Sequence, residues 1–219
     1  GSPGSATIII WLTGSGERAG VMADLAASLV VERVGRDDLS LRALATLRMT
    51  VFRSWPYLYD GSVDYEAAYL DEFLSAEDAV VIVARVGDIP VGMATASPMA
   101  TQSHVIKAPF VAAGVAVDTL YYFGESVLLP QFRGQGIGHR FFDEREAAAR
   151  AAGADCATFC AVVRQDDDPR RPHGARDLQG FWRNRGYSLA PGYDTQLSWK
   201  EVGAAQESEH LMRFWIKRL

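Results

Sequence analysis

The sequence predicts an α/β domain in which strands and helices share one core. Residues 121–129 form an apolar, β-branched and aromatic run that is typical of a buried strand. A proline and three glycines follow, and residues 141–152 continue with the alanine-rich, charged pattern of a helix. The chain has 219 residues, of which 48% are hydrophobic, so it is long enough to bury a full core.

The N-terminal half predicts alternating element types. An amphipathic helix is expected over residues 39–52, because Leu41, Leu44, Leu47 and Val51 recur at helical spacing. Two apolar runs, 79–86 and 91–97, predict strands joined by a turn at residues 87–90.

In the C-terminal third, residues 155–163 and 196–200 are expected to form strands. Residues 207–219 are amphipathic, and their apolar members are Leu211, Met212, Phe214, Trp215 and Leu219. We expect this end to dock on the domain or on a second subunit, because free Trp and Phe side chains are costly to expose.

The strand, glycine turn and helix start around Gly134, Gly136 and Gly138 predict a cradle for a phosphate group. Glycine lets bare backbone N–H groups approach an anion, and the helix dipole adds positive potential. The phosphate-loop motif requires Lys and then Ser or Thr after its last glycine, whereas His139 and Arg140 stand here. The dinucleotide fingerprint fails as well, because these glycines are spaced by two.

The turn resembles the acetyl-CoA loop of the GNAT N-acetyltransferase superfamily, Gln/Arg-x-x-Gly-x-Gly/Ala. Two overlapping registers match it, one starting at Gln131 and one at Arg133. The resemblance extends over about residues 28–200, with 28–34 as the family's first strand, 65–74 as its second helix and 178–185 as its late helix. It is strongest for a subgroup that carries the segments at residues 52–61 and 123–130. It implies a central mixed, mostly antiparallel sheet flanked by helices, with splayed parallel strands that hold acetyl-CoA.

The resemblance also implies the cofactor contacts. Ser126, Val127 and Leu128 would offer backbone groups to the pantetheine arm, and an N–H near Val127 or Leu128 would polarise the thioester carbonyl. Arg133 would add a charge contact or remain a solvated surface arginine. The residues expected around the pyrophosphate are Phe132, Gly134, Gln135, Gly136, Ile137, Gly138 and His139.

Glu125 is the candidate general base. An alkyl ammonium with a pKa of about 10 must lose a proton before it attacks a thioester. Glu125 is a carboxylate within an otherwise apolar run, directly before the residues expected to hold the thioester. The alternative is a structural glutamate that is satisfied by a neighbouring arginine or by backbone N–H groups.

The general acid of the family has no counterpart here. Many members place a Tyr on the late helix, and Trp182 stands at the matching position. An indole is a poor acid, so Ser126 and Tyr187 are the candidate substitutes, unless the CoA thiolate leaves without help. Trp182 is expected to pack against the cofactor arm or the core.

The segment at residues 52–61 is rich in aromatic side chains and would wall the acceptor pocket. We take Trp55, Tyr57 and Tyr59 as pocket residues and Asp60 as an amine contact. The alternative is an aromatic cluster that pins the loop to the core. A second candidate rim, at residues 164–176, carries mixed charge.

The domain organisation follows from these assignments. Residues 1–5 are expected to be a cloning remnant, 6–27 an N-terminal extension, and 28–219 the acetyltransferase domain. Residues 14–20 imitate a nucleotide-binding glycine loop, but no second mononucleotide unit follows.

Composition limits the partners. The net charge of −5 argues against general nucleic-acid binding, and no apolar run is long enough for a membrane span or a signal peptide. Cys156 and Cys160 are about 13 Å apart on one predicted strand, so no disulfide is expected and a reducing cytoplasm fits. The four histidines lack metal-ligand spacing, so no metal is expected.

Three functions remain open from the sequence. The favoured one is acetyl-CoA-dependent transfer to a primary amine of a small molecule or peptide, by direct attack in a ternary complex, in a monomer or homodimer. The second is a non-catalytic acyl-CoA-binding or sensing module on the same fold. The third is a nucleotide-binding protein that uses the N-terminal glycine loop.

Overall fold

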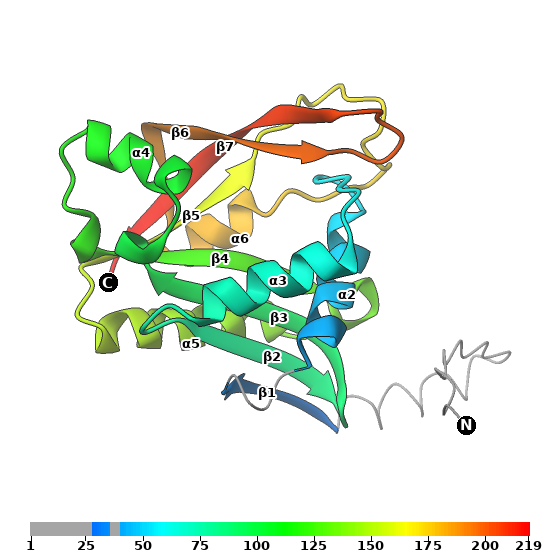
Figure 1. Ribbon diagram of the computed structural model, residues 1–219, viewed down its shortest axis with the longest axis horizontal. Helices are drawn as coiled ribbons and strands as arrows, with labels where there is room; N and C mark the ends of the chain where they lie inside the picture. The colour runs from blue at the N-terminus through cyan, green and yellow to red at the C-terminus, as the bar shows by residue number, and fades with distance from the viewer. Residues whose placement is uncertain (1–27, 36–39) are drawn as a thin grey trace, which may run out of the picture.

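In the computed structural model, residues 28–35 and 40–219 are described, and they form one mixed sheet with helices on both faces (Figure 1). The sheet has seven strands in the order β1-β2-β3-β4-β5-β7-β6. Neighbouring strands are antiparallel except β4 and β5. The expected mixed, mostly antiparallel sheet is therefore confirmed. The strands are β1 (Leu29–Val34), β2 (Val80–Val86), β3 (Ile89–Pro98), β4 (Leu120–Leu128), β5 (Cys156–Val162), β6 (Ser188–Lys200) and β7 (Glu207–Arg218).

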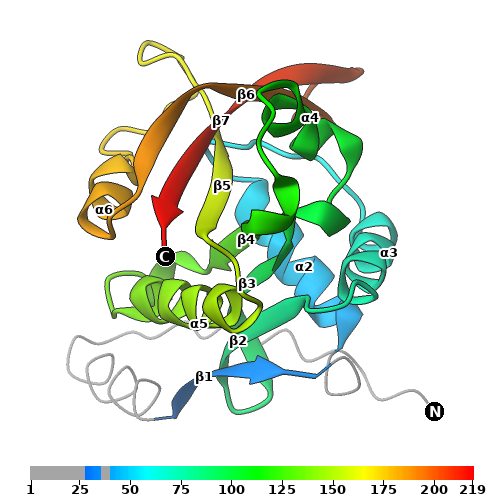
Figure 2. The ribbon, with the colours of Figure 1, turned by 90° about the vertical axis from the view of Figure 1, so that its left-hand side faces the viewer.

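The helices divide between the two faces of the sheet (Figure 2). One face carries α2 (Leu41–Phe52), α3 (Val63–Leu74) and α4 (His104–Ala112), and the other carries α5 (Ile137–Ala151) and α6 (Gln179–Asn184). The α2 and α3 helices begin at Ser40 and Ser62, whose side chains accept N–H groups of the first turn. None of the described helices combines the length and the apolar character that crossing a bilayer requires.

The parallel strands β4 and β5 separate soon after they meet. They pair only at three positions, from Leu120 with Cys156 to Tyr122 with Thr158. Beyond Tyr122, β4 continues to Leu128 beside β3, while β5 continues to Val162 beside β7. We call the space between these two unpaired stretches the β4–β5 opening, and it confirms the expectation of splayed parallel strands.

A β-bulge in β4 lies at the start of this opening. Ala96 of β3 pairs with Phe123 and Ala94 pairs with Ser126, so the single residue Thr95 faces both Gly124 and Glu125. A Cβ atom at Gly124 would lie 2.4 Å from the Thr95 hydroxyl, and that hydroxyl accepts the Glu125 N–H at 3.3 Å. The close approach therefore requires glycine at position 124.

The bulge changes which residues of β4 share a face. Before it, Tyr121 and Phe123 pack with α5 in the core, whereas after it Val127 packs with α2 and α3. Glu125, two residues before Val127, points to the same face as Val127 and meets α2.

Two expectations about the chain's second half were incomplete. The strand expected at residues 196–200 is only the end of the long strand β6, and β7 follows it. Residues 207–218 form this strand between β5 and β6, rather than an appended amphipathic end. The segment does dock on the domain, through backbone pairing on both of its edges. The helix α4, inserted between β3 and β4, was not expected at all.

Candidate active site at the opening between β4 and β5

Glu125 is buried and paired with an arginine. Its Oε1 forms an ion pair with Nη1 of Arg48 from α2, and its side chain lies within the protein at only 9% exposure. The guanidinium of Arg48 also donates through Nε to Oε2 of Glu66 from α3, at 2.6 Å. Two helices, α2 and α3, and the strand β4 thus each contribute one residue to a buried group of charges. We call this group the Arg48 cluster: Arg48, Glu66 and Glu125.

Aromatic side chains surround the Arg48 cluster. The guanidinium lies 4.7 Å from the ring centre of Tyr69 and 5.3 Å from that of Phe52. The Tyr59 hydroxyl donates to Oε1 of Glu66 at 2.6 Å. Burial disfavours the charged guanidinium, but Glu125, Tyr69 and Glu66 outweigh this effect, so the pKa of Arg48 is raised. Burial and the hydrogen bond to Glu66 likewise raise the pKa of the Tyr59 phenol.

The aromatic segment at residues 52–61 lies between this cluster and the tip of the β6–β7 hairpin. The Trp199 indole donates to the Tyr57 carbonyl at 2.9 Å, and Tyr59 bridges to Glu201 through the backbone. Burial raises the pKa of the Tyr57 phenol, and the neighbouring Val162 backbone at the end of β5 acts in the opposite direction. The Tyr57 side chain therefore reaches the β4–β5 opening.

Arg164, the second residue beyond β5, holds the same segment. It donates to the carbonyls of Pro56 and Tyr57, at 2.7 and 3.1 Å, and its Nη2 lies 2.6 Å from Oε1 of Glu201. Its guanidinium also lies 5.8 Å from the Trp55 ring centre. Residues 52–61, the end of β5 and the hairpin tip are thus tied together at one side of the opening.

The four expected acceptor residues do not all lie together. Tyr57 reaches the opening and Tyr59 contacts the Arg48 cluster, while Trp55 lies under Arg164. Asp60 forms ion pairs with Arg53, at 2.7 Å, and with Lys200, at 3.2 Å. The hydrogen bond from Arg53 is the largest cause that lowers the pKa of Asp60. Asp60 therefore takes part in a surface ion-pair network.

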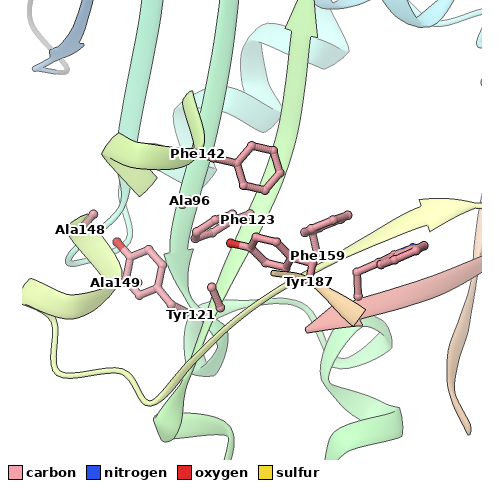
Figure 3. Close-up of a cluster of buried hydrophobic side chains, with 10 residues drawn as sticks. Ala96, Tyr121, Phe123, Phe142, Ala148, Ala149, Phe159 and Tyr187 are labelled. Carbon is pink, nitrogen blue, oxygen red and sulfur yellow. The ribbon is translucent and has the colours of Figure 1, made fainter. Parts of the chain in front are cut away.

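The two expected proton donors have different surroundings. Ser126 is exposed and, by the alternation of the strand, faces away from Glu125. Tyr187 is buried among Phe123, Phe142 and Phe159 on the α5 side (Figure 3). Its hydroxyl donates to Glu146 at 3.2 Å, and burial raises its pKa. Among the described contacts, no hydrogen bond joins Tyr187 to Glu125 or Ser126.

Trp182 packs in the core, as one of the two expected alternatives. Its ring centre lies 5.0 Å from that of Phe159 and 5.1 Å from that of Trp215, both at edge-on angles. The indole therefore stabilises the joint between α6, β5 and β7.

The glycine turn leads into the N-terminus of α5. Gly134 and Gly136 have positive φ angles, +78° and +80°, and Gly136 is the N-cap of the helix. No side chain caps α5 and its first turn contains no acidic residue. The N–H groups of Ile137, Gly138 and His139 are therefore left for an acceptor from outside this turn.

The side chains expected in the cofactor loop fall into two groups. Phe132 and Ile137 are buried with Phe141 in the core, so only their backbone groups are open to a ligand. Arg133, Gln135 and His139 are exposed. The Leu129 N–H donates to Val91, and Arg133 donates to the Leu128 carbonyl at 3.3 Å. By alternation, the N–H of Leu128, rather than that of Val127, faces the opening.

Arg48 and Glu66 were not predicted from the sequence, although a signal exists. Arg48 follows Leu44 by four residues on the apolar stripe of α2, and Glu66 precedes Leu70 by four residues on that of α3. A charged residue on a buried helix face requires a partner, and here each supplies one to the other.

The remaining expectations concern the cysteines, a metal site and the N-terminal glycine loop. Cys156 and Cys160 are both free, and the Cys160 thiol lies 3.3 Å from the Tyr122 hydroxyl. Within the described ranges, no group of three or more His, Cys, Asp or Glu residues is arranged for a metal ion. The glycine loop at residues 14–20, and the domain boundary at residue 28 with it, involve residues outside those that the structure describes.

Solved structures with a similar fold include acetyltransferases. The structure superposes on a ribosomal-protein-alanine N-acetyltransferase from Brucella melitensis with a TM-score of 0.58 and 15% identity, over 87% of this chain and 99% of that chain. A putative acetyltransferase from Salmonella typhimurium, solved with its cofactor acetyl-CoA, gives a TM-score of 0.56 and 11% identity, over 88% and 94%. No curated protein matches the sequence.

The family assignment comes from the sequence itself. The model of the acetyltransferase (GNAT) family matches residues 44–172, which is more than half of the chain. This range contains most of α2, the bulged strand β4, the glycine turn and α5. The chain therefore belongs to the GNAT acetyltransferase family.

Proposed function

We propose that the protein transfers an acetyl group from acetyl-CoA to a primary amine of a small molecule or peptide. The observation that carries this proposal is a buried carboxylate, Glu125, at the start of the β4–β5 opening, with the uncapped N-terminus of α5 at the other end of the same strand-and-turn segment. The family and a structural neighbour that was solved with acetyl-CoA support it.

The residues present fit acetyl-CoA as co-substrate. The unpaired first-turn N–H groups of α5 suit a pyrophosphate, since they donate hydrogen bonds along a helix dipole. Ser126 and Leu128 turn backbone groups toward the opening, where a pantetheine arm requires an extended partner strand. The exposed side chains of Arg133, Gln135 and His139 add polar contacts at the turn.

In this proposal, residues of the chain transfer the protons and stabilise the negative charge that develops on the thioester oxygen. Acetyl-CoA supplies the thioester. Glu125 takes one proton from the acceptor ammonium, directly or through water. The freed nitrogen then forms the new N–C bond as the C–S bond breaks, and the second proton that this nitrogen loses goes to the departing thiolate. The N–H of Leu128 donates to the oxygen on which negative charge develops. Ser126, which faces away from Glu125, is the candidate proton donor to the departing thiolate.

A glycine substitution tests cofactor binding. Gly136→Glu places a negative charge at the helix N-terminus, at a φ of +80° that disfavours side chains, so affinity for acetyl-CoA should fall at least ~tenfold. The matched control is Gly153→Glu, at the other end of α5 with a φ of +75° and equally open surroundings. Isothermal calorimetry on the two folded variants makes the comparison, and equal affinities would remove the proposed cofactor site.

The sensing module remains the second candidate, because Tyr187 is not directed to the opening. Release of CoA thiol in the presence of a panel of primary amines separates it from the enzyme. A protein that binds acetyl-CoA but releases no thiol with any amine is a binding module.

A further inference from the structure

The Arg48 cluster holds more negative than positive charge in direct contact. Glu66 and Glu125 both pair with the one guanidinium of Arg48. The exposures of Arg48, Glu66 and Glu125 are 8%, 2% and 9%, so water provides little compensation. A buried carboxylate in excess requires a positive partner, or it destabilises the fold.

The hydrogen bonds show where that partner belongs. Both oxygens of Glu66 are used, Oε2 by Arg48 and Oε1 by the Tyr59 hydroxyl. Oε1 of Glu125 is used by Arg48. Within the described residues, Oε2 of Glu125 is the carboxylate oxygen of the cluster to which no hydrogen bond or ion pair is assigned.

The neighbouring cationic side chains contact groups other than Glu125. Arg53 and Lys200 pair with Asp60, and Arg164 pairs with Glu201. Arg145 acts on Glu125 electrostatically, but it lies on the α5 face, where its guanidinium stacks 4.6 Å from the ring centres of Phe123 and Phe142. None of these cations contacts Glu125 directly.

We propose that Glu66 is a specificity-determining residue, which keeps the Arg48 cluster one negative charge in excess and so makes the site select an acceptor in its cationic ammonium form. The ammonium would pair with Oε2 of Glu125, the group that afterwards receives its proton. This inference rests on the proposed function and narrows its acceptor to amines that are protonated when they bind.

The chemistry separates two classes of amine. Alkyl amines, with a pKa of about 10, are ammonium ions at neutral pH. Arylamines such as 4-methoxyaniline are neutral at neutral pH and provide no charge to the cluster. Glu66→Gln leaves the Arg48–Glu125 ion pair, which has no net charge. This variant should lose the preference for alkyl amines and bind arylamines as wild type does.

The experiment compares wild type and Glu66→Gln with two acceptors, 1,5-diaminopentane and 4-methoxyaniline, at pH 7.5. Thiol release gives kcat and KM, and calorimetry gives acetyl-CoA affinity separately. In wild type we expect a higher kcat/KM with the diamine than with the arylamine. In Glu66→Gln, the KM for the diamine should rise at least ~tenfold, with the KM for the arylamine and the affinity for acetyl-CoA within about twofold.

Two further variants exclude a merely structural effect. Glu72→Gln removes the same charge from an exposed position on the same helix and should change nothing. Glu66→Asp retains the charge and should restore most of the diamine KM. If Glu66→Gln does not fold, the comparison of the two acceptors in wild type and in Glu66→Asp still decides whether the site prefers the cationic amine.

The outcomes separate the inference from the proposed function. If wild type prefers the arylamine, or if Glu66→Gln changes both acceptors equally, the inference is overturned while acetyl transfer stands. Acetyl-CoA binding without thiol release to either amine class overturns both. Failure to bind acetyl-CoA overturns the proposed function at its first step.

Discussion

At the scale of single residues, the site depends on how Glu125 is held. Thr95 accepts its N–H, and Arg48 fixes one carboxylate oxygen. Glu125→Gln preserves the shape of the side chain but removes the proton acceptor. Turnover with an alkyl amine at neutral pH should therefore drop by roughly 10²–10⁴-fold, with acetyl-CoA affinity within a few-fold.

The pH dependence of Glu125→Gln provides the control. As pH rises toward the pKa of the free amine, more acceptor arrives already deprotonated, so the difference between the variant and wild type should shrink. Thiol release measured from pH 7 to pH 9.5 checks this. A variant that keeps near-normal turnover across this range would show that the base lies elsewhere.

The sequence predicts this residue better than its partners. Glu125 was identifiable because a carboxylate interrupts an apolar strand. Arg48 and Glu66 were not, because the pairing between α2 and α3 depends on how the two helices pack, which helical spacing alone does not define. The core position of Trp182 was one of two alternatives, and only packing against Phe159 and Trp215 decides between them.

At the scale of elements, the β6–β7 hairpin contains a histidine that should make stability depend on pH. His210 of β7 stacks on Trp199 of β6 with ring centres 3.7 Å apart. Burial is the main cause that lowers the pKa of His210 below its usual 6.5. The unfolded chain then binds the proton more readily than the folded one, so stability is retained above pH 6.5 and is lost as pH falls below it.

Urea denaturation at pH 7.5 and pH 5.5 tests the histidine. Wild type should lose unfolding free energy at the lower pH, and His210→Gln should lose less. His104→Gln, a change at the exposed start of α4, should behave as wild type does. An equal pH dependence of wild type and His210→Gln would contradict the assignment.

Elements with regular patterns were predicted well, and those shaped by their neighbours were not. The helix α2 and the strands β2 and β4 lie within one or two residues of their expected bounds. Strand β7 was misinterpreted because it lies between β5 and β6 and buries neighbouring residues such as Phe214 and Trp215 on opposite faces. Simple alternation fails under these conditions.

At the scale of the whole molecule, the two halves of the sheet meet through few backbone contacts. The β4–β5 opening leaves three residue pairs between them, so side chains must supply the rest. Arg164 is one such tie, because it joins β5 and Glu201 to the carbonyls of residues 56 and 57.

Removal of this tie should destabilise the whole fold. Arg164→Met removes the less exposed of two arginine partners of Glu201 and leaves the Pro56 carbonyl without its donor, while the Tyr57 carbonyl keeps Trp199. This change should cost about 2–4 kcal/mol and lower the Tm by roughly 5–10 °C. The control is Arg170→Met, which removes a more exposed partner of the same Glu201 and should cost at most about 1 kcal/mol. Calorimetric melting curves compare them, and equal losses would show that Arg164 has no special role.

The overall architecture was predictable because the glycine turn and its flanking strand and helix belong to a recognisable family pattern. The position of the aromatic segment at residues 52–61 was not. Its contacts with Trp199, Arg164 and Glu201 join residues more than 100 positions apart, and no local pattern records such a distance.

The bulge in β4 determines which core each half of this strand faces. Phe123 and Val127 are four residues apart and would share a face in a flat strand, yet they serve opposite cores. Deletion of Gly124 would leave Phe123 and Glu125 on opposite faces by plain alternation. If Gly124 instead paired as an ordinary strand residue, either Glu125 would turn into the apolar layer beside Phe142, or Phe123 would turn toward Arg48. One extra residue without a side chain thus allows a single strand to support an apolar core on one side and a carboxylate on the other.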